Sequence, residues 1–257
     1  MAAEFQFARY PGLQDVSVFV SGGATGVGEA IVRAYAAEGA KVGFVDLAEK
    51  EGEALTEELN ADGATVSFRR CDITDTDAYR AAISSLEAEN GPVQVLLNNA
   101  ANDTRHDWRE VTPEYFDSRI AVNLRHTFFA IQAVAPGMIA AGKGAIVNFG
   151  SVGWMMANGG YPSYAASKAA VHGMTRSFAR DLGKHGIRVN TLVPGWVMTS
   201  RQLELWVDDA ANEQIDKNQC MAGRVLPEDI ARMALFLGSD DAKMCSAQNF
   251  IVDGGWV

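Results

Sequence analysis

The chain has 257 residues, enough for one large α/β domain or two small ones. Hydrophobic residues make up 48% of the sequence and charged residues 21%, which is typical of a soluble globular protein. The formal net charge of −10 argues against a nucleic-acid partner, because binding to phosphates needs clustered cations.

Short runs rich in β-branched residues alternate along the chain with Ala-, Glu- and Leu-rich stretches long enough for helices. The apolar runs are nearly continuous, which predicts a parallel sheet covered by helices on both faces, in a doubly wound α/β arrangement. No linker or low-complexity tract divides the chain, so we expect one domain over 1–257. The predicted strands are 16–20, 41–46, 64–70, 93–98, 144–150, 187–194 and 248–254.

The segment 197–224 is the one irregular zone of this pattern, and it follows the sixth predicted strand. Ligands of open α/β sheets bind at the carboxyl edge of the strands. We therefore interpret 197–224 as a small lid of short helices that covers the substrate.

The first strand runs directly into a glycine-rich turn with Gly22, Gly23, Gly26 and Gly28, and a helix follows. Such a turn lets backbone N–H groups approach a pyrophosphate, and the N-terminus of the helix adds a favourable dipole. A strand before the glycines and a helix after them is the context that a dinucleotide site requires. A glycine-rich turn without a ligand is the alternative.

Asp46 ends the second predicted strand, where a carboxylate can accept hydrogen bonds from both hydroxyls of the adenosine ribose. It would repel a 2′-phosphate, and no Arg or Lys follows it before Lys50. The sequence therefore favours NAD over NADP as the cofactor. The alternative role for Asp46 is to cap the following helix.

Tyr164 and Lys168 lie four residues apart in a predicted helix, so their side chains share one face. Two unit charges ~4 Å apart at an effective dielectric of ~20 interact by about 4 kcal/mol. A lysine at that distance could lower the pKa of a phenol by up to roughly three units, and so make Tyr164 a base. Tyr161 is seven residues from Lys168, about 10 Å along the helix, and Pro162 suits a first helical turn. The spacing thus favours Tyr164.

These motifs, taken in order over essentially the whole chain, resemble the short-chain dehydrogenase/reductase family. The resemblance rests on the glycine spacing, "CDITD" at 71–75, "NNAA" at 98–101, "VNL" at 122–124, the Ser151–Tyr164–Lys168 spacing and "PGWVMT" at 194–199. Ser21 and Ala101 depart from the family's usual Thr and Gly. The family implies a Rossmann-type fold with a seven-stranded parallel sheet. It also implies a catalytic set of Asn123, Ser151, Tyr164 and Lys168, with Ser151 holding the substrate oxygen and Asn123 holding a water that links Lys168 to solvent.

The same resemblance implies the residues that contact the cofactor. They follow the carboxyl ends of the predicted strands and include the two catalytic residues of the sixth helix. They are Gly22, Thr25, Gly26, Val27, Asp46, Leu47, Asp72, Ile73, Asn99, Ala100, Ala101, Tyr164, Lys168, Pro194, Gly195, Val197 and Thr199.

A narrower resemblance, carried by "NDTRH", "VNLRHTFF", "QAVAPGM" and "DAKMCSAQNFIVDGGW", is to bacterial NAD-dependent aldose 1-dehydrogenases of the D-xylose type. These oxidise a cyclic sugar at its anomeric carbon to a lactone. Tryptophan faces suit a sugar ring and amides suit its hydroxyls. The expected substrate-binding residues are Asn102, Ser151, Gly153, Trp154, Asn158, Tyr164, Trp196 and Arg201.

Other interpretations stay open at this point. Arg201 could clamp an anion, which would suit a dehydrogenase of a secondary alcohol in a sugar acid. A nucleotide-sensing regulator with a dead active site is disfavoured, because Ser151, Tyr164 and Lys168 are all present. Trp154 could equally line an apolar pocket or a subunit contact.

The remaining expectations concern metals, compartment and assembly. The four histidines show no metal spacing, and the three scattered cysteines suggest reduced thiols in the cytoplasm. Segment 1–14 lacks a basic region, and no apolar run is long enough for a signal peptide or a membrane span. Members of the family are commonly tetramers, built with long helices around 112–135 and 162–182 and the C-terminal tail. We therefore expect a homotetramer.

Overall fold

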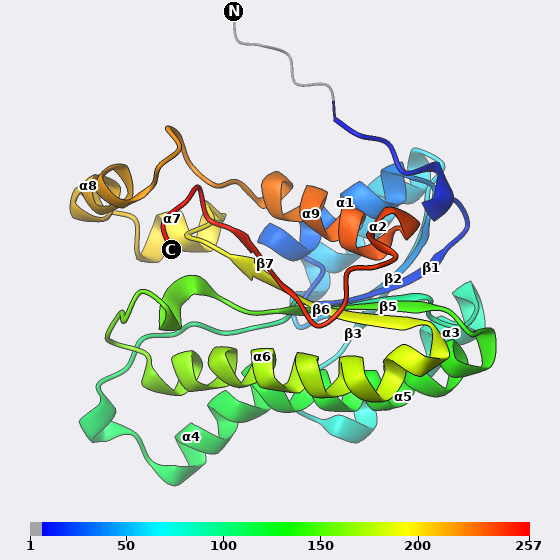
Figure 1. The fold of residues 1–257 in the computed structure, drawn as a ribbon, viewed down its shortest axis with the longest axis horizontal. Helices are drawn as coiled ribbons and strands as arrows, with labels where there is room; N and C mark the ends of the chain where they lie inside the picture. The colour runs from blue at the N-terminus through cyan, green and yellow to red at the C-terminus, as the bar shows by residue number, and fades with distance from the viewer. Residues whose placement is uncertain (1–6) are drawn as a thin grey trace, which may run out of the picture.

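The protein is described here from a computed structural model that covers residues 7–257. Residues 1–6, part of the N-terminal segment discussed above, lie outside the described residues. The described part contains one sheet of seven parallel strands in the order β3-β2-β1-β4-β5-β6-β7 (Figure 1). The strands are β1 (Ser17–Ser21), β2 (Lys41–Asp46), β3 (Thr65–Arg70), β4 (Val95–Asn98), β5 (Gly144–Phe149), β6 (Ile187–Pro194) and β7 (Asn249–Val252).

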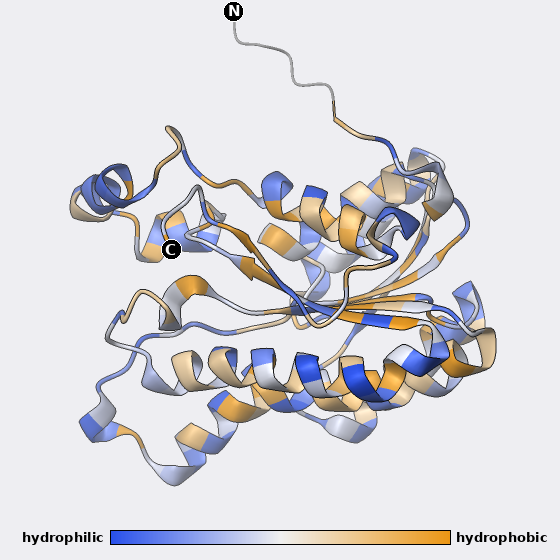
Figure 2. Ribbon diagram, in the orientation of Figure 1, coloured by the Kyte–Doolittle hydropathy of each residue, from blue (hydrophilic) through white to orange (hydrophobic). Residues whose placement is uncertain are grey.

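Helices cover both faces of this sheet, as the continuous apolar strands predict. Figure 2 shows hydrophobic residues concentrated along the strands and on the helix sides that face them. One core lies between the sheet and α1, α2 and α9, and a second lies between the sheet and α3, α5 and α6. The helices are α1 (Gly26–Ala37), α2 (Glu49–Ala61), α3 (Thr76–Asn90), α4 (Pro113–Ile120), α5 (His126–Ala141), α6 (Pro162–Leu182), α7 (Ser200–Leu205), α8 (Asp209–Asn218) and α9 (Pro227–Gly238).

The strand order changes direction at β1, which pairs with β2 on one side and with β4 on the other. The connections after β1 and β4 therefore leave the sheet on opposite faces and open a crevice at the carboxyl edge. The glycine-rich turn follows β1 and the loop from Asn99 follows β4, so both border this crevice. The predicted fold class is confirmed.

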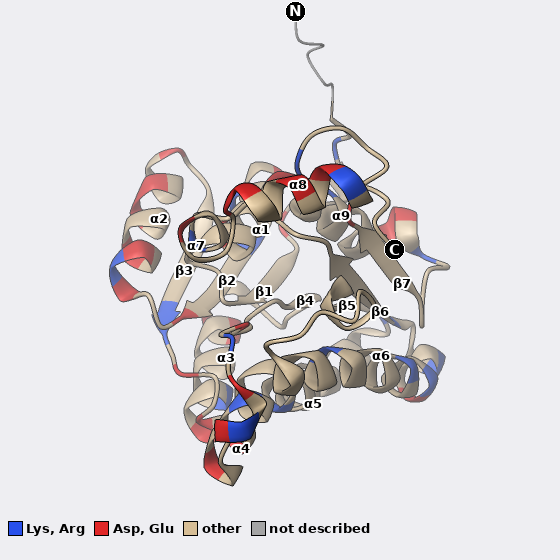
Figure 3. Ribbon diagram, turned by 90° about the vertical axis from the view of Figure 1, so that its left-hand side faces the viewer, with Lys and Arg blue, Asp and Glu red and all other residues tan. Residues whose placement is uncertain are grey.

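The segment 197–224 contains the expected short helices, α7 and α8. Both ends of the segment are held together by a bridge between Val197 and Val225. Figure 3 views the molecule from the side on which α7 and α8 lie, with α4 on the opposite side of the sheet. The segment thus lies over the carboxyl edge where the crevice opens.

The long helix expected around 112–135 is not one regular α-helix. A π-helical turn, Ala121–Arg125, separates α4 from α5, and α5 extends to Ala141 although Pro136 lies inside it. The extension buries Met138 in the core beneath the sheet. By contrast, α6 spans Pro162–Leu182, as predicted. No helix within residues 7–257 is both long enough and apolar enough to cross a membrane.

Candidate active site

The glycine-rich turn closes tightly on itself. Gly22 has φ +69°, and a Cβ atom on Gly28 would lie 1.7 Å from the carbonyl oxygen of Gly22. The same oxygen accepts a hydrogen bond of 2.8 Å from Nδ2 of Asn99, in the loop after β4. The turn is therefore tied to the neighbouring strand end, and the first turn of α1 faces the crevice with free backbone donors.

A large cavity of about 1260 Å³ lies along this turn. It combines the N-terminus of α1, which suits a pyrophosphate, with carboxylates at the ends of β2 and β3. These residues fit a dinucleotide. The predicted cofactor residues that line the cavity are Gly22, Thr25, Gly26, Val27, Asp46, Leu47, Asp72, Ile73, Asn99, Ala100, Ala101 and Thr199.

Asp46 is held rigidly at the end of β2. Its Oδ2 accepts a hydrogen bond of 3.0 Å from the backbone N–H of Ala24, and its Oδ1 accepts one of 3.0 Å from that of Ala48. The residue that caps α2 is Ala48, so Asp46 is not itself the N-cap. The carboxylate joins the glycine-rich turn to the start of α2 while it faces the large cavity.

A smaller cavity of about 270 Å³ adjoins the first, and Val27, Asn99, Ala101 and Thr199 line both. Ser151, Tyr164 and Lys168 come together there, from the end of β5 and the start of α6. The remaining predicted cofactor residues, Pro194, Gly195 and Val197, line it as well. The arrangement can therefore bring a hydroxyl-bearing ligand between the phenol and a nicotinamide.

Helix α6 positions the two candidate catalytic side chains. Pro162 occupies its first turn and Tyr161 its N-cap. Lys168 is 2% exposed, and its Nζ lies 5.8 Å from the centre of the Tyr164 ring and donates a hydrogen bond of 2.7 Å to the carbonyl of Phe149. The ring of Tyr161 packs edge-on against that of Tyr164, so Tyr161 lines the cavity beside the phenol.

The pKa shifts of Tyr164 and Lys168 differ from those expected for an exposed pair. Burial raises the pKa of Tyr164 above its ordinary value, against a hydrogen bond to Ser151 that lowers it. Burial lowers the pKa of Lys168 to about 8, with the Asp103 carboxylate acting in the opposite direction. Burial therefore dominates the pKa of Tyr164, and the lowering expected from Lys168 does not appear in the protein alone. The ammonium group of Lys168 is directed at the Phe149 carbonyl instead.

Ser151 begins the short 3-10 turn Val152–Trp154, where its Oγ accepts a hydrogen bond of 3.0 Å from the N–H of Gly153. This contact uses a lone pair of the oxygen, so the hydroxyl hydrogen can be donated to Tyr164 or to a ligand oxygen. Gly153 itself lies close to the hydroxyl of Tyr161, which a Cβ would approach to 3.0 Å. The loop after β5 is therefore packed tightly against the mouth of α6.

Asn123 lies in the π-helical turn and is fully buried. Its side chain accepts a hydrogen bond of 2.8 Å from the N–H of Asn102 and donates one of 3.1 Å to the carbonyl of Asn102. It also donates to the carbonyl of Arg119, at 3.0 Å. Asn123 thus supports the loop after β4 from behind and lines neither of the two cavities.

The expected substrate residues lie in three different places. Ser151, Gly153, Asn158, Tyr164, Trp196 and Arg201 line the smaller cavity. Asn102 lies on the larger one, with its Oδ1 accepting a bond from the N–H of Thr104. Trp154 lines neither cavity, because its indole packs edge-on against His172 and is 38% exposed.

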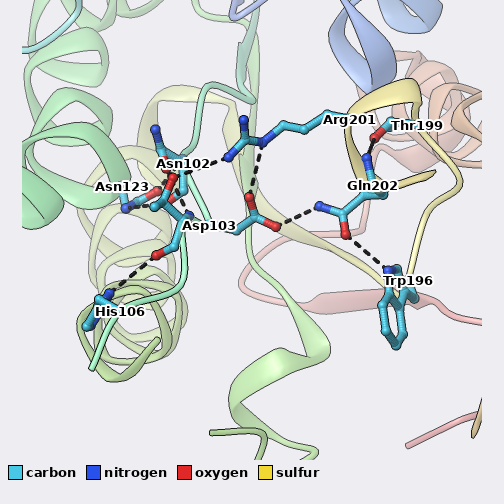
Figure 4. Close-up of polar contacts among 9 residues, drawn as sticks. Asn102, Asp103, His106, Asn123, Trp196, Thr199, Arg201 and Gln202 are labelled. Atoms are coloured by element: carbon cyan, nitrogen blue, oxygen red, sulfur yellow. Dashed lines mark hydrogen bonds and ion pairs between the residues drawn. The ribbon is translucent and has the colours of Figure 1, made fainter. Parts of the chain in front are cut away.

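Arg201 is already engaged, as Figure 4 shows. Its Nε lies 3.4 Å from Oδ1 of Asp103, and its Nη2 donates a hydrogen bond of 3.2 Å to Thr104. Oδ2 of Asp103 accepts a bond of 2.6 Å from Nε2 of Gln202, and Oε1 of Gln202 accepts one of 3.0 Å from the indole N–H of Trp196. Arg201, which the sequence suggests as a ligand-binding residue, is therefore paired with the carboxylate of Asp103.

Several cavity residues were not predicted from the sequence. They include Asp103, Arg105 and Gln202. Asp103 lies five residues beyond the end of β4, at the carboxyl edge, and this position is the signal that could have identified it. Arg105 stacks over the Trp206 ring at 4.4 Å, a contact with the lid that no local pattern indicates.

Residues 7–257 contain no group of three or more His, Cys, Asp or Glu side chains that could hold a metal ion.

The chain resembles two sugar dehydrogenases along nearly its whole length. It is 43% identical to the D-xylose 1-dehydrogenase of Caulobacter vibrioides, over 97% of this chain and 98% of that protein. It is 41% identical to a protein of Rhizobium meliloti named as a probable galactose dehydrogenase, over 96% of this chain and 97% of that protein.

Solved structures share the fold. A 7α-hydroxysteroid dehydrogenase complexed with NADH superposes with a TM-score of 0.92 at 29% identity, covering 96% of each chain. A blue fluorescent protein from a metagenomic library, in complex with NADPH, superposes with a TM-score of 0.87 at 34% identity, covering 96% of this chain and 99% of the other.

A family model described as enoyl-(acyl carrier protein) reductase matches residues 22–257. With the serine, tyrosine and lysine gathered beside a dinucleotide-shaped crevice, this match confirms the resemblance: the chain belongs to the short-chain dehydrogenase/reductase family and is an oxidoreductase that uses a nicotinamide cofactor.

Proposed function

We propose that this protein is an NAD-dependent dehydrogenase that oxidises the anomeric C1 hydroxyl of a neutral aldose and forms a lactone. The observation that carries the proposal is the small cavity in which Tyr164, Lys168 and Ser151 meet the indole of Trp196. An indole face suits the apolar face of a sugar ring, and the two sugar dehydrogenases at 43% and 41% identity support the substrate class.

The protein's own groups supply the proton chemistry. The Tyr164 phenolate takes the proton of the substrate hydroxyl, which Ser151 holds beside it through a hydrogen bond. Lys168 supplies positive charge next to the phenol. In this proposal the turn at Asn123 holds a water that passes the proton onward, although the Asn123 side chain is itself bonded to the backbone of Asn102 and Arg119. The nicotinamide, when bound, supplies the hydride acceptor and a further positive charge that favours the phenolate.

NAD is the proposed cofactor because Asp46 places a fixed carboxylate on the large cavity where the adenosine ribose would lie. A carboxylate accepts hydrogen bonds from two ribose hydroxyls but repels a 2′-phosphate. The two oxygens of Asp46 are also anchored to backbone N–H groups, so the side chain cannot easily turn away to admit a phosphate.

The competing candidate, a dehydrogenase of a secondary alcohol in a sugar acid, depends on Arg201 as an anion clamp. The guanidinium is instead paired with Asp103, which also lines the cavity, and a substrate carboxylate would have to compete with it. This pairing favours a neutral sugar.

We further propose that 1–257 acts as a single catalytic domain with 197–224 as its lid. The protein would work as a homotetramer in the cytoplasm. The exposed apolar side chains of Phe116 and Phe128, on α4 and α5, support a subunit interface on that side of the molecule.

A substrate panel tests the function. Neutral aldoses, uronic acids and aldonic acids are offered with NAD and with NADP, and NADH or NADPH formation is followed by fluorescence. We expect the highest kcat/KM with a neutral aldose and NAD, with NADP poorer by at least about tenfold, equivalent to about 1.4 kcal/mol. Preference for NADP, or activity confined to sugar acids, would overturn the corresponding half of the proposal.

The base is tested with Tyr164→Phe. The variant keeps the ring and its packing but removes the proton acceptor, so we expect kcat to fall by at least about 10³-fold while NAD affinity changes little. Tyr161→Phe, three residues earlier, is the matched comparison and should lower kcat by less than about tenfold. Near-normal turnover by Tyr164→Phe would refute the mechanism.

A further inference from the structure

Asp103 joins two parts of the protein that are far apart in the sequence. It lies in the loop after β4, and both of its oxygens accept hydrogen bonds from α7 of the lid. Nε2 of Gln202 lies 2.6 Å from Oδ2, and Nε of Arg201 lies 3.4 Å from Oδ1. The Asp103 side chain is 28% exposed, so the carboxylate is partly shielded from water where it meets the lid.

The second link runs from Gln202 to Trp196, whose indole N–H donates to Oε1 at 3.0 Å. The two end groups fix the direction of both hydrogen bonds in the series from Asp103 through Gln202 to Trp196. An ionised carboxylate can only accept hydrogen bonds, and an indole N–H can only donate. Gln202 satisfies both ends in one orientation alone, with its NH₂ toward Asp103 and its oxygen toward Trp196.

The indole is supported from its other side as well. The ring of Trp256, in the C-terminal tail, lies 6.4 Å from that of Trp196. The tail is itself fixed by Asp253, which is buried and accepts hydrogen bonds from the N–H groups of Gly255 and Val257. Trp196 thus lines the substrate cavity between a packed ring and a polar anchor.

We propose that Asp103 is a positioning residue that acts through Gln202 to hold the Trp196 indole in the orientation that receives the sugar ring. This inference rests on the proposed function, because the ring that the indole receives is the aldose. Asp103 itself needs no contact with the reacting atoms. Its effect should appear in sugar binding rather than in hydride transfer or in NAD binding.

Because Gln202 donates and Asp103 accepts, the contact can be tested by exchanging the donor and the acceptor. Gln202→Glu places a carboxylate against the Asp103 carboxylate, so the two repel each other and the link to the loop is broken. Asp103→Asn, added to it, restores a donor opposite the new acceptor and keeps the net charge of the wild type. Gln214→Glu, on the exposed surface of α8, adds the same charge to the lid without meeting Asp103 and serves as the matched control.

The variants are compared as purified full-length protein by steady-state kinetics with D-xylose as the probe. We expect Gln202→Glu to raise KM for D-xylose about tenfold, equivalent to about 1.4 kcal/mol, with kcat and KM for NAD changed less than about twofold. The double variant should return KM to within about threefold of the wild type, and Gln214→Glu should leave it unchanged. An unchanged KM in Gln202→Glu, or a double variant no better than the single one, would overturn the proposal.

A second readout separates this inference from the function on which it rests. If the wild type oxidises no neutral aldose, the proposed function fails. The contact between Asp103 and Gln202 is then tested by the rate of tryptic cleavage within 197–224. We expect that cleavage to be at least about threefold faster in Gln202→Glu and restored in the double variant. Equal rates in all variants would show that Asp103 does not hold Gln202 in place and would overturn the proposal.

Discussion

Lys168 shows how burial changes the role that spacing alone assigns to a residue. Four residues of helix bring it to the same face as Tyr164, as predicted, yet its ammonium group donates to the Phe149 carbonyl and is almost fully buried. Burial disfavours the charged form and lowers the pKa of the lysine to about 8. The charge that the proposed mechanism places beside Tyr164 is therefore maintained at a cost to the stability of the fold.

This cost predicts a pH dependence of stability. The pKa of Lys168 is about 8 in the folded protein and about 10.5 in the unfolded chain, so the penalty is complete below pH 8 and vanishes as pH rises to 10.5. Relative to Lys168→Met, the wild type should gain up to about 3 kcal/mol in free energy of unfolding across that window. Urea unfolding of both proteins at several pH values measures the difference. A difference that does not vary with pH would contradict the buried charge.

At the scale of elements, the π-helical turn explains why Asn123 lies where it does. The turn interrupts the helix between α4 and α5 and leaves the carbonyl of Arg119 to the Asn123 amide. The same amide pairs with both backbone groups of Asn102, at the loop that leads to Asp103. One side chain thus connects a helix irregularity on one face of the sheet to the loop that borders the substrate cavity.

Asn123→Ala should therefore lower both stability and activity. It leaves three partly buried backbone groups without their partner, which we expect to reduce the free energy of unfolding by about 2–4 kcal/mol. The comparison is Asn60→Ala, because Asn60 pairs in the same way with the N–H and carbonyl of Val66, away from the site. Asn60→Ala should lose less stability and keep full kcat. Urea unfolding and kcat for both variants check this, and an Asn123→Ala protein as stable as the wild type would contradict it.

The sequence predicted the elements better than the contacts between them. Continuous apolar runs located all seven strands to within two residues at every boundary, because buried parallel strands have a strong local pattern. The π-helical turn was missed, since it depends on hydrogen bonds to a distant loop. The lid helices were expected, but the way they meet Asp103 was not, because residues about a hundred positions apart carry no shared local signal.

In the candidate site, too, local spacing predicted some residues correctly, whereas residues that depend on tertiary packing were missed. Tyr164, Lys168 and Ser151 meet because a helical turn and a sheet edge bring them together, and sequence spacing shows both. Trp154 was expected in the substrate cavity, yet it packs on His172, because rotation of a side chain in a loop depends on its packing neighbours. The Arg201 guanidinium lacked a visible partner in the sequence, and the fold provides one in Asp103.

At the scale of the whole molecule, apolar side chains at the surface of α5 and α6 predict that subunits associate through these helices. Phe128 on α5 is 44% exposed and packs on Phe178 of α6 with ring centres 5.3 Å apart, so a cluster spans both helices. We expect a homotetramer by size-exclusion chromatography with light scattering. Phe128→Glu should place a charge in the interface and yield smaller species with unchanged secondary structure. A monomeric wild type at micromolar concentration would contradict the expected assembly.

The central claim is that hydride leaves C1 of a neutral aldose. The most direct measurement uses D-xylose deuterated at C1 with NAD, followed by NMR or mass spectrometry of both products. The proposed function predicts that the reduced cofactor carries the deuterium and that the sugar product is a lactone. Reduced cofactor without deuterium, formed while D-xylose is consumed, would show oxidation at another carbon and contradict the claim.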